Sequence, residues 1–248
     1  MEILVLLNSL ALALVIINSF TIRVVKNEKT IVSNSVSILI PMRNEQANVE
    51  GCLSSVIGQR GLENFEVIAL DDHSKDATKS LISTFPVVKI IAGTNPPDQW
   101  LGKLWACQQL AEASTGEYLV FLDADVRLNE NAVASSIAKM SNWDFYSPYP
   151  RQIVKGFIQR IFQPLLQWSW LVSVPLLISQ RFSIKSMAIA NGQFLIIKRD
   201  AYLKSGGHAS VKSEVLDDLM LARKLLGSGF KGGVGEASAV ASCHMYST

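Results

Sequence analysis

Apolar and polar positions alternate along the chain in blocks, a pattern typical of a parallel sheet covered by helices. Four nearly continuous apolar runs predict strands, at 36–41, 65–70, 87–91 and 118–122, the first of them fully buried. Helical patterns follow these runs, to about Gln59, from about Asp76 and from Lys103 to Ala113. This alternation predicts an α/β fold, a mostly parallel sheet with helices on both faces.

A longer apolar stretch, "ILVLLNSLALALVIINSF" at 3–20, has the length needed to cross a bilayer. Arg23, Lys26 and Lys29 follow it and no basic residue precedes it. The stretch therefore predicts a single-pass transmembrane anchor over 1–22, with the rest of the chain on the cytoplasmic face of the cell membrane. A cleaved signal peptide is the alternative, although such peptides start with basic residues and this chain does not.

A second apolar region lies at 156–179, "GFIQRIFQPLLQWSWLVSVPLLIS". One helical face carries its large apolar residues, Phe157, Ile161, Leu165 and Trp168. This region predicts a helix lying in the membrane interface, at about 153–180, within a second half of the chain at 151–248. Pro164 and Pro175 interrupt it, and an ordinary core helix with two kinks fits the pattern equally well.

The composition is low in charge, with 18% charged residues and a formal net charge of +2. Basic residues are scattered along the chain, so nucleic acid is not an expected partner. The three cysteines, Cys52, Cys107 and Cys243, lie far apart without metal-ligand spacing, which favours buried reduced thiols.

Polar residues follow the predicted strands at the points where they end. Asp123 and Asp125 come directly after the strand at 118–122, and in an extended chain they project to the same side. Two carboxylates aimed at one point repel each other unless a positive group lies between them. The segment 41–45 and the pair Asp71-Asp72 follow two other strands. Since ligands of parallel sheets bind at the carboxyl ends of the strands, 34–150 is predicted to form the ligand-binding half.

Five segments in this order resemble glycosyltransferase family 2 enzymes of the GT-A fold, which is Rossmann-like. They are "SILIPMRNE" (37–45), "VIALDDHSKDAT" (67–78), "GKLWA" (102–106), "FLDADVRL" (121–128) and "LDDLMLARKLLGSGF" (216–230). "GGH" at 206–208 and the terminal "CHMYST" resemble the membrane-associated branch that glycosylates lipids, including hopanoid and carotenoid enzymes.

The resemblance implies a nucleotide-sugar donor, with UDP the family's commonest carrier, and Mn²⁺ or Mg²⁺ as cofactor. It makes 34–150 the nucleotide-sugar-binding half and 151–248 the acceptor-binding half, truncated at its C-terminus. By this resemblance Asp125 is a metal ligand, and Asp123 faces the metal or the ribose. A divalent cation held by carboxylates and phosphate oxygens stabilises a departing diphosphate. Taken alone, the two acids would also fit a strand end capped by solvated carboxylates.

The same resemblance assigns further residues to the nucleotide sugar. Asp72 resembles the carboxylate that reads the nucleobase, Pro41, Arg43 and Glu45 line the pocket, and Lys103 meets a phosphate near a helix start. Plainer interpretations exist for each: a capped turn around Asp72, a surface ion pair between Arg43 and Glu45, and a solvated helix face for Lys103.

Asp217 and Asp218 open a predicted helix, where acids are favoured by the helix dipole. Their "DD-x-x-LAR" context resembles the family's ED motif, which implies Asp218 as catalytic base and Asp217 as its support. A hydroxyl acceptor needs such a base, whereas a carboxylic acid is already ionised near neutral pH. The two acids therefore favour a hydroxyl acceptor over a carotenoid acid.

Together these features predict an inverting, metal-dependent glycosyltransferase acting on a lipid or polyisoprenoid hydroxyl at the membrane. Two departures weigh against it: His244 stands where relatives carry arginine, and the chain stops at Thr248 where they continue. A truncated, non-catalytic nucleotide-binding relative is therefore an alternative. A nucleotidyltransferase on a similar fold is another, but the segment 41–48 lacks its Gly-rich basic loop. The absent QxxRW motif argues against polysaccharide elongation.

Overall fold

The computed structural model describes residues 1–154 and 157–243, and within 157–167 the side chains of Arg160, Ile161 and Leu165. His244, singled out in the sequence, lies outside the described residues. The strands are β1 (Arg23–Val24), β2 (Val36–Met42), β3 (Phe65–Asp71), β4 (Val88–Ala92), β5 (Tyr118–Leu122), β6 (Val126–Leu128), β7 (Phe145–Tyr149), β8 (Arg151–Gln152), β9 (Phe194–Lys198), β10 (Gly232–Glu236) and β11 (Ala241–Cys243).

Within the described residues, eight of these strands form one sheet in the order β1-β10-β7-β9-β5-β2-β3-β4. β9 runs antiparallel to its neighbours β5 and β7, and every other pair is parallel. The four predicted strands correspond to β2, β3, β4 and β5, shifted by at most one residue at either end. The predicted α/β fold with a mostly parallel sheet is confirmed.

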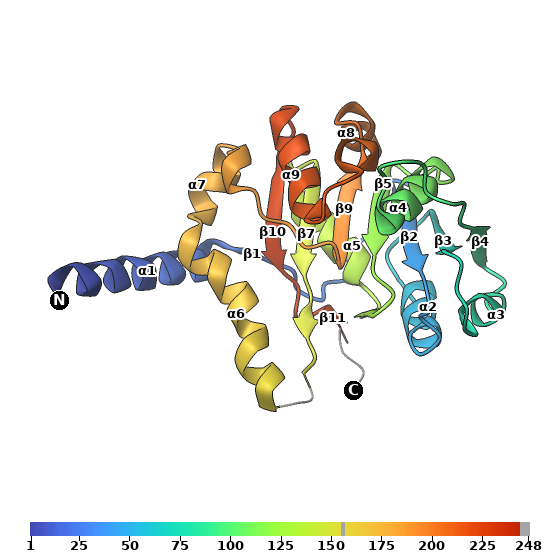
Figure 1. Ribbon diagram of the computed structural model, residues 1–248, viewed down its shortest axis with the longest axis horizontal. Helices are drawn as coiled ribbons and strands as arrows, with labels where there is room; N and C mark the ends of the chain where they lie inside the picture. The colour runs from blue at the N-terminus through green and yellow to red at the C-terminus, as the bar shows by residue number, and fades with distance from the viewer. Residues whose placement is uncertain (155–156, 244–248) are drawn as a thin grey trace.

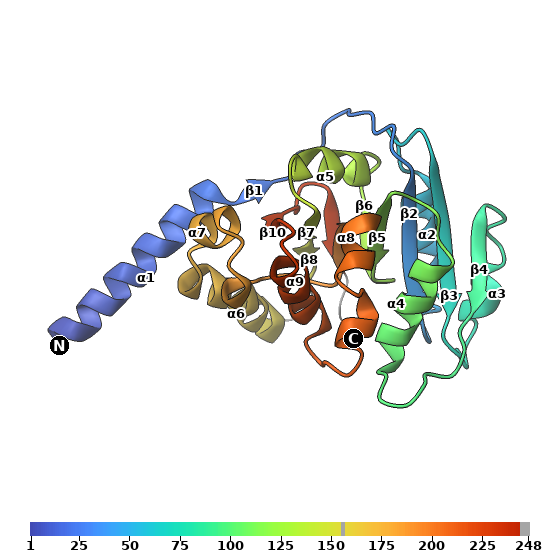
Figure 2. The ribbon, with the colours of Figure 1, turned by 90° about the horizontal axis from the view of Figure 1, so that it is seen from above.

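The helices are α1 (Glu2–Thr21), α2 (Val49–Ile57), α3 (Thr78–Ile82), α4 (Gly102–Glu112), α5 (Ala132–Met140), α6 (Phe157–Ser173), α7 (Leu176–Arg181), α8 (Arg199–Lys204) and α9 (Asp217–Gly227), with short 3₁₀ turns at Lys185–Met187 and His208–Val211. Figure 2 shows α2, α3 and α5 on one face of the sheet and α4, α8 and α9 on the other. On each face, a separate cluster of buried apolar side chains fills the space between the strands and the helices. The sheet is therefore covered on both sides, and its open positions are its rims.

A smaller sheet, in the order β6-β11-β8, crosses the carboxyl rim of the large one. β11 pairs antiparallel with β6, which places Cys243 opposite Val126. The last described residues of the chain therefore lie against the turn that carries Asp123 and Asp125.

Helix α1 leaves the body of the protein across the direction of the strands, and α6 and α7 pack against its C-terminal half (Figure 1). It is long and apolar enough to span a membrane by length and composition. The prediction that Pro164 and Pro175 both interrupt the second apolar region is wrong for Pro164, since α6 runs through that position. A proline removes one backbone donor and can bend a helix without ending it. At Pro175 the helix does break, and the backbone groups at the break are bound by a side chain from another helix.

That side chain belongs to Asn18 of α1, which is fully buried. Its side-chain amide donates to the carbonyls of Leu171 and Val174, both at 2.8 Å, and its oxygen accepts from the N–H of Leu176 at 3.0 Å. The backbone groups left free where α6 ends and α7 begins are thus satisfied by one side chain of α1. This explains an asparagine inside an otherwise apolar stretch.

Candidate active site

Three loops at the carboxyl rim carry most of the residues singled out in the sequence. They follow β2, β3 and β5, and because β2 pairs in parallel with both β3 and β5, the loops lie side by side. Parallel pairing is therefore what brings the segments after residues 42, 71 and 122 together.

Hydrogen bonds join the loop after β2 to the loop after β3. The backbone N–H of Asn44 donates to the Ser74 hydroxyl, and the Asn44 side chain accepts from the N–H of Lys75. The N–H of Glu45 donates to the Thr78 hydroxyl at 2.8 Å. The two loops therefore form one polar wall, and the Ser74 hydroxyl helps to hold this junction.

Asp72 is buried in that wall between an arginine and a histidine. Its Oδ2 lies 3.5 Å from Nη1 of Arg43, and its Oδ1 lies 3.1 Å from Nδ1 of His73. The surface ion pair considered between Arg43 and Glu45 does not form, because Glu45 accepts a hydrogen bond from the Asn48 side chain instead. Arg43 is largely exposed, so it leaves Asp72 open to a polar ligand.

Lys103, on the first turn of α4, makes an ion pair with Asp123. Its Nζ lies 2.7 Å from Oδ1 of Asp123. Burial would lower the pKa of Lys103, but the Asp123 carboxylate raises it above its usual range. Burial raises the pKa of Asp123, and the negative charge of Asp125 adds to this while Lys103 opposes it. The positive group required beside the paired acids is, in the free protein, the Lys103 ammonium.

Asp125 is held differently from Asp123. Its Oδ2 accepts a hydrogen bond from the Cys243 thiol at 3.2 Å, and that sulfur is contacted at 2.9 Å by the side-chain amide of Gln193. Its Oδ1 is buried and has no hydrogen-bond partner within the described residues. A buried carboxylate oxygen without a partner is costly, so it indicates a missing ligand such as a cation.

The donor set fits a hard divalent cation only in part. In the part of the chain that the structure describes, no group of three or more His, Cys, Asp or Glu side chains is arranged to hold a metal ion. Mg²⁺ and similar ions are commonly bound by one or two carboxylates together with substrate phosphates and water. The orphaned oxygen of Asp125, with Asp123 nearby, fits that mode rather than a site made wholly of protein ligands.

Arg127 supports the turn that carries both acids. Its Nη1 donates to the carbonyls of Ala124 and Val126, both at 2.9 Å, and its Nη2 donates to the Asn48 side chain at 2.9 Å. A Cβ at Gly51 would lie 2.5 Å from the Arg127 Nε. The guanidinium thus fits into space left by a glycine of α2, and it connects the acidic turn to the loop after β2.

Asp217 and Asp218 lie on the first turn of α9, as predicted. Oδ2 of Asp218 accepts from the N–H of Gly192 at 2.8 Å, and Oδ1 accepts from the N–H of Leu219 at 2.7 Å. Burial raises the pKa of Asp218; the Leu219 N–H opposes this and the Asp217 charge adds to it. A carboxylate that is oriented by two backbone donors and is more basic than usual has the properties of a general base.

Two adjoining cavities bring these groups into one site. The first has a volume of about 360 Å³ and is lined by every residue predicted to bind the nucleotide sugar or the metal: Pro41, Arg43, Glu45, Asp72, Lys103, Asp123 and Asp125. The second is small, about 20 Å³, and is lined by Asp217 and Asp218. Pro41, Lys103 and Asp123 belong to both, so the Lys103–Asp123 pair lies at their junction.

Sequence reasoning missed four residues of this site. His73 contacts Asp72, and Arg127 holds the turn that carries Asp123 and Asp125. Cys243 contacts Asp125 directly, and Gln193 contacts the Cys243 sulfur. Arg127 lies inside the segment 121–128 and His73 inside 67–78, so proximity in sequence was an available signal. Cys243 and Gln193 come from distant strands, and the sequence carried no signal for their contact.

The fold and this rim of acids and cations define an α/β protein of the GT-A type. The family model described as glycosyl transferase family 2 matches residues 37–206, well over half of the chain, so the chain belongs to glycosyltransferase family 2. The family predicted from the sequence is confirmed.

Relatives and solved structures agree with this assignment. The chain is 25% identical over 202 residues to the 4,4'-diaponeurosporenoate glycosyltransferase of Staphylococcus haemolyticus, covering 77% of this chain and 51% of the relative. It is 25% identical over 191 residues to that of Staphylococcus aureus (strain USA300), covering 75% and 50%. The chain thus spans about half the length of the curated relatives it matches.

Two solved structures share the fold. The mannosyltransferase PcManGT from Pyrobaculum calidifontis, in complex with GDP-Man and Mn²⁺, matches with a TM-score of 0.64 and 19% identity, over 96% of this chain and 66% of that one. S. aureus TarS 1-349, in complex with UDP-GlcNAc, matches with a TM-score of 0.59 and 17% identity, over 86% and 59%. At these identities the likeness concerns the fold.

Proposed function

We propose that this chain is a membrane-anchored, inverting, metal-dependent glycosyltransferase that moves a sugar from a nucleotide-sugar donor to a hydroxyl of a lipid acceptor. One observation carries the proposal: the Lys103–Asp123 pair lies at the junction of a nucleotide-sized cavity and a smaller one holding Asp217 and Asp218. A donor diphosphate bound at the pair has its sugar directed toward the second cavity, beside Asp218.

The donor half of the site suits a nucleoside diphosphate. Asp72 offers a buried acceptor to a nucleobase edge, with Arg43 and Glu45 on the same wall, and Lys103 offers a cation to phosphate. Asp125, with Asp123, would hold Mn²⁺ or Mg²⁺, which when bound stabilises the charge on the leaving diphosphate. UDP and GDP both occur among structural neighbours, and the described residues favour neither.

In the transfer step, Asp218 accepts the proton of the acceptor hydroxyl. The oxygen forms a bond to the anomeric carbon as the bond from that carbon to the diphosphate oxygen breaks on the opposite face, so the configuration inverts. Asp217 keeps negative charge beside Asp218, and the Gly192 N–H holds its orientation. The transition state has oxocarbenium character, as in glycoside hydrolysis.

The acceptor class rests on the apolar helices. Helix α1 supports a single-pass anchor, with Arg23 and the lysines that follow it supporting a cytoplasmic catalytic domain. On α6, which crosses α1, the side chains of Ile161, Leu165 and Trp168 are about half exposed. Large apolar side chains exposed beside an anchor favour a helix lying on the membrane over a core helix.

The acceptor group is proposed as a hydroxyl. The Staphylococcus relatives are named for diaponeurosporenoate, a carboxylate, which needs no base. Asp218 is half-buried and its pKa is raised, properties that favour proton abstraction from an alcohol. The lipid is of the polyisoprenoid or a similar apolar class.

The test is a nucleotide titration on the detergent-solubilised protein, using UDP and GDP, each with Mn²⁺ or with EDTA. We expect one nucleotide to bind in a metal-dependent way, and Asp125→Asn to abolish that binding. Asp98→Asn removes an exposed carboxylate away from the cavity and is the matched control, expected to bind as the wild type does. Equal affinities in wild type and Asp125→Asn would overturn the metal assignment, and binding without any transfer would identify a non-catalytic relative.

A further inference from the structure

A separate cavity of about 490 Å³ lies where α1 ends. It starts at Thr21, the last residue of that helix. Arg23, just after the helix, also lines the cavity, and distant parts of the chain contribute Asn142, Trp143, Leu177, Gln180, Arg181, Phe182 and Lys231. The function proposed above uses none of them as a ligand.

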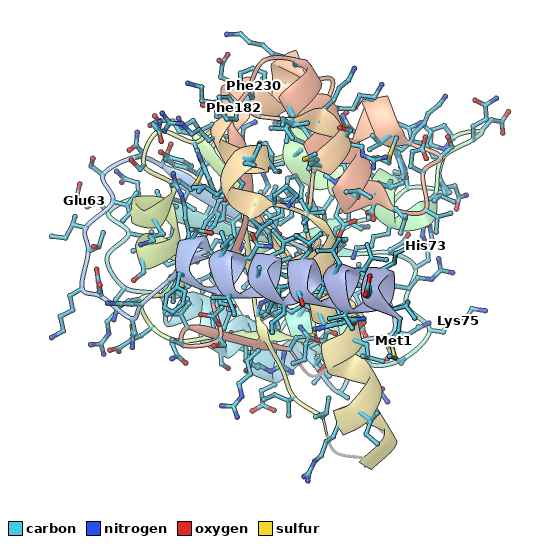
Figure 3. The ribbon with its side chains drawn as sticks, turned by 90° about the vertical axis from the view of Figure 1, so that its left-hand side faces the viewer. Met1, Glu63, His73, Lys75, Phe182 and Phe230 are labelled. Carbon is cyan, nitrogen blue, oxygen red and sulfur yellow. The ribbon has the colours of Figure 1, made fainter. Side chains whose placement is uncertain are left out.

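This cavity lies at the amino rim of the sheet, opposite the candidate active site. Trp143 and Lys231 come just before β7 and β10, which pair in parallel. β7 also runs parallel to β5, because both are antiparallel to β9. Figure 3 accordingly shows Phe182 far from His73, which belongs to the donor wall. A ligand in this cavity cannot be the donor sugar nucleotide.

The lining carries three cations, Arg23, Arg181 and Lys231, and no carboxylate among its residues. Neither Arg181 nor Lys231 makes an ion pair within the described residues. Asp144, adjacent to Trp143, is outside the lining: one of its oxygens is paired with Lys198 at 3.0 Å, and the other accepts a hydrogen bond from the backbone N–H of Lys231 at 2.9 Å. The cavity therefore has uncompensated positive charge and suits an anion.

Arg23 is fixed in place within this cavity. Its guanidinium carbon lies 3.5 Å from the centre of the Trp143 ring, and its Nη1 donates to the carbonyls of Lys139 and Met140, both at 2.8 Å. A cation held by an aromatic face and by carbonyls needs little further ordering to bind an anion. Arg181 and Lys231, which are exposed, complete the charge around the opening.

The opening of the cavity is apolar as well as cationic. Phe182 is 68% exposed and Leu177, another lining residue, is 51% exposed. Both belong to the segment that packs on α1 near the end of its apolar stretch (Figure 2). Exposed aromatic and aliphatic side chains beside cations, at the level where a span ends, are typical of the lipid headgroup region.

We propose that this cavity binds the phosphate headgroup of an anionic phospholipid in the leaflet next to the end of α1. The inference rests on α1 being the membrane anchor of the proposed function. Headgroup binding at this point gives the catalytic domain a second attachment beside its single span, and so fixes the rotation of the domain about α1. With that rotation fixed, the apolar face of α6 stays on the membrane.

The test is a titration of the detergent-solubilised full chain with each probe, and the melting temperature of the protein is the measure of binding. The probes are short-chain phosphatidylglycerol, phosphatidylcholine of the same chain length, and inorganic phosphate. A ligand that binds the folded state raises its melting temperature in a saturable way. We expect phosphatidylglycerol to do so, phosphatidylcholine to have no saturable effect, and inorganic phosphate to bind at least tenfold more weakly.

The variants separate the cavity from general charge. Arg181→Gln/Lys231→Gln should weaken phosphatidylglycerol binding at least tenfold, while Lys26→Gln/Lys29→Gln, which removes two exposed cations outside the cavity, should not. Retained nucleotide binding in the first double variant shows that it folds, and Lys231→Glu alone is a second variant expected to weaken phosphatidylglycerol binding.

Three results would overturn the proposal: equal binding by both double variants, equal responses to the two lipids, or phosphate binding as tight as the lipid. If the wild type binds phosphatidylglycerol but shows no metal-dependent nucleotide binding, the proposed function is wrong and the lipid site stands.

Discussion

Lys103 and Asp123 form a 2.7 Å ion pair in the wall of the cavity where a donor diphosphate would lie. In the free protein the lysine neutralises one of two adjacent carboxylates, which would otherwise repel each other. A metal ion bound by Asp123 and Asp125 would take over that role and release the ammonium to a phosphate oxygen. The pair therefore offsets the repulsion between the two acids until a ligand binds.

The first prediction concerns this lysine. Lys103→Gln removes a charged hydrogen bond to phosphate, a contribution of about 1.5–3 kcal/mol, so the affinity for UDP or GDP with Mn²⁺ should fall roughly 10- to 150-fold. Lys103→Arg keeps the positive charge and should therefore retain more of the nucleotide affinity than Lys103→Gln does. Lys79→Gln, on the exposed side of α3, is the matched control. The prediction fails if calorimetry gives Lys103→Gln the wild-type affinity.

The second prediction concerns Arg127 as a positioning residue. Arg127→Gln loses the hydrogen bonds that hold the turn between Asp123 and Asp125, and the apparent affinity for Mn²⁺ should fall about tenfold or more. Gly51→Ala should shift Mn²⁺ affinity in the same direction, because the new Cβ displaces the guanidinium. Arg60→Gln, which breaks a surface ion pair with Glu130, is the control.

A merely structural role for Arg127 would lower the melting temperature and leave Mn²⁺ affinity unchanged. The readout is therefore a Mn²⁺ titration at fixed nucleotide, measured beside the melting temperature. Equal Mn²⁺ affinities for Arg127→Gln and Arg60→Gln would contradict the assignment.

The sheet and its rim were predictable because their signals are local. Each buried strand reads as a continuous apolar run that ends in a polar residue, and parallel pairing then brings Asp72 and Asp123 to the same edge. The antiparallel direction of β9 between β5 and β7 had no comparable signal, since direction in a sheet depends on the path of the intervening chain.

Contacts between distant segments were not predictable. Asn18 reads as a polar interruption of an apolar stretch, and only its position against the break before Leu176 explains it. Cys243 reads as a structural thiol, and it is buried, but the pairing of β11 with β6 places it on Asp125. Such contacts depend on register between strands far apart in sequence, which composition and periodicity do not encode.

The third prediction concerns the pH dependence of transfer. Asp218 acts as a base only when ionised, so kcat should fall as the pH drops through its pKa, which burial raises above the ordinary aspartate value of 3.8. Asp217→Asn removes a negative charge that helps to raise this pKa, so the acidic limb should move to lower pH. Asp218→Asn should abolish transfer to a hydroxyl lipid and leave nucleotide binding intact.

The measurement is a pH–rate profile for kcat with alcohol and carboxylate lipids as parallel acceptors. A limb that stays in place or moves upward in Asp217→Asn would refute the coupling between the two acids. Transfer by Asp218→Asn to a carboxylate lipid alone would identify the acceptor as an acid.

The fourth prediction concerns His208, which is fully buried against Phe121 and hydrogen-bonded to the Tyr202 hydroxyl at 2.8 Å. Burial lowers its pKa to about 3, and the charge of Lys103 adds to this. Because the unfolded chain binds the proton near pH 6.5 and the folded one does not, stability falls as the pH drops from 6.5 toward 3. At pH 5.5 the loss is about 1.4 kcal/mol.

That loss corresponds to roughly 3–6 °C in melting temperature for a chain of this size. His208→Asn keeps a polar side chain but does not titrate, so its melting temperature should change less between pH 7.5 and 5.5 than that of the wild type. The two proteins are compared by thermal scans at both pH values. An equal change in both would mean that other groups, chiefly carboxylates, account for the acid sensitivity.

The fifth prediction concerns Asn18, whose side chain joins α1 to the break between α6 and α7. Asn18→Leu leaves two carbonyls and one N–H without their partner in a buried position, which costs about 1–3 kcal/mol for each group that finds no other partner. Measured hydrogen bonds between membrane helices are weaker, about 0.6–2 kcal/mol, so a total loss of about 2–4 kcal/mol is expected.

Asn8→Leu is the matched control, because the exposed Asn8 side chain bonds only to the Leu4 carbonyl within its own helix. Thermal scans in detergent should show a lower melting temperature for Asn18→Leu and a nearly unchanged one for Asn8→Leu. If Asn18 also orients the membrane-facing helices, proteolysis in the segment between α6 and α7 should accelerate in Asn18→Leu alone. Equal melting temperatures and equal cleavage rates for the two variants would show that α1 is held by apolar packing and that Asn18 adds nothing measurable.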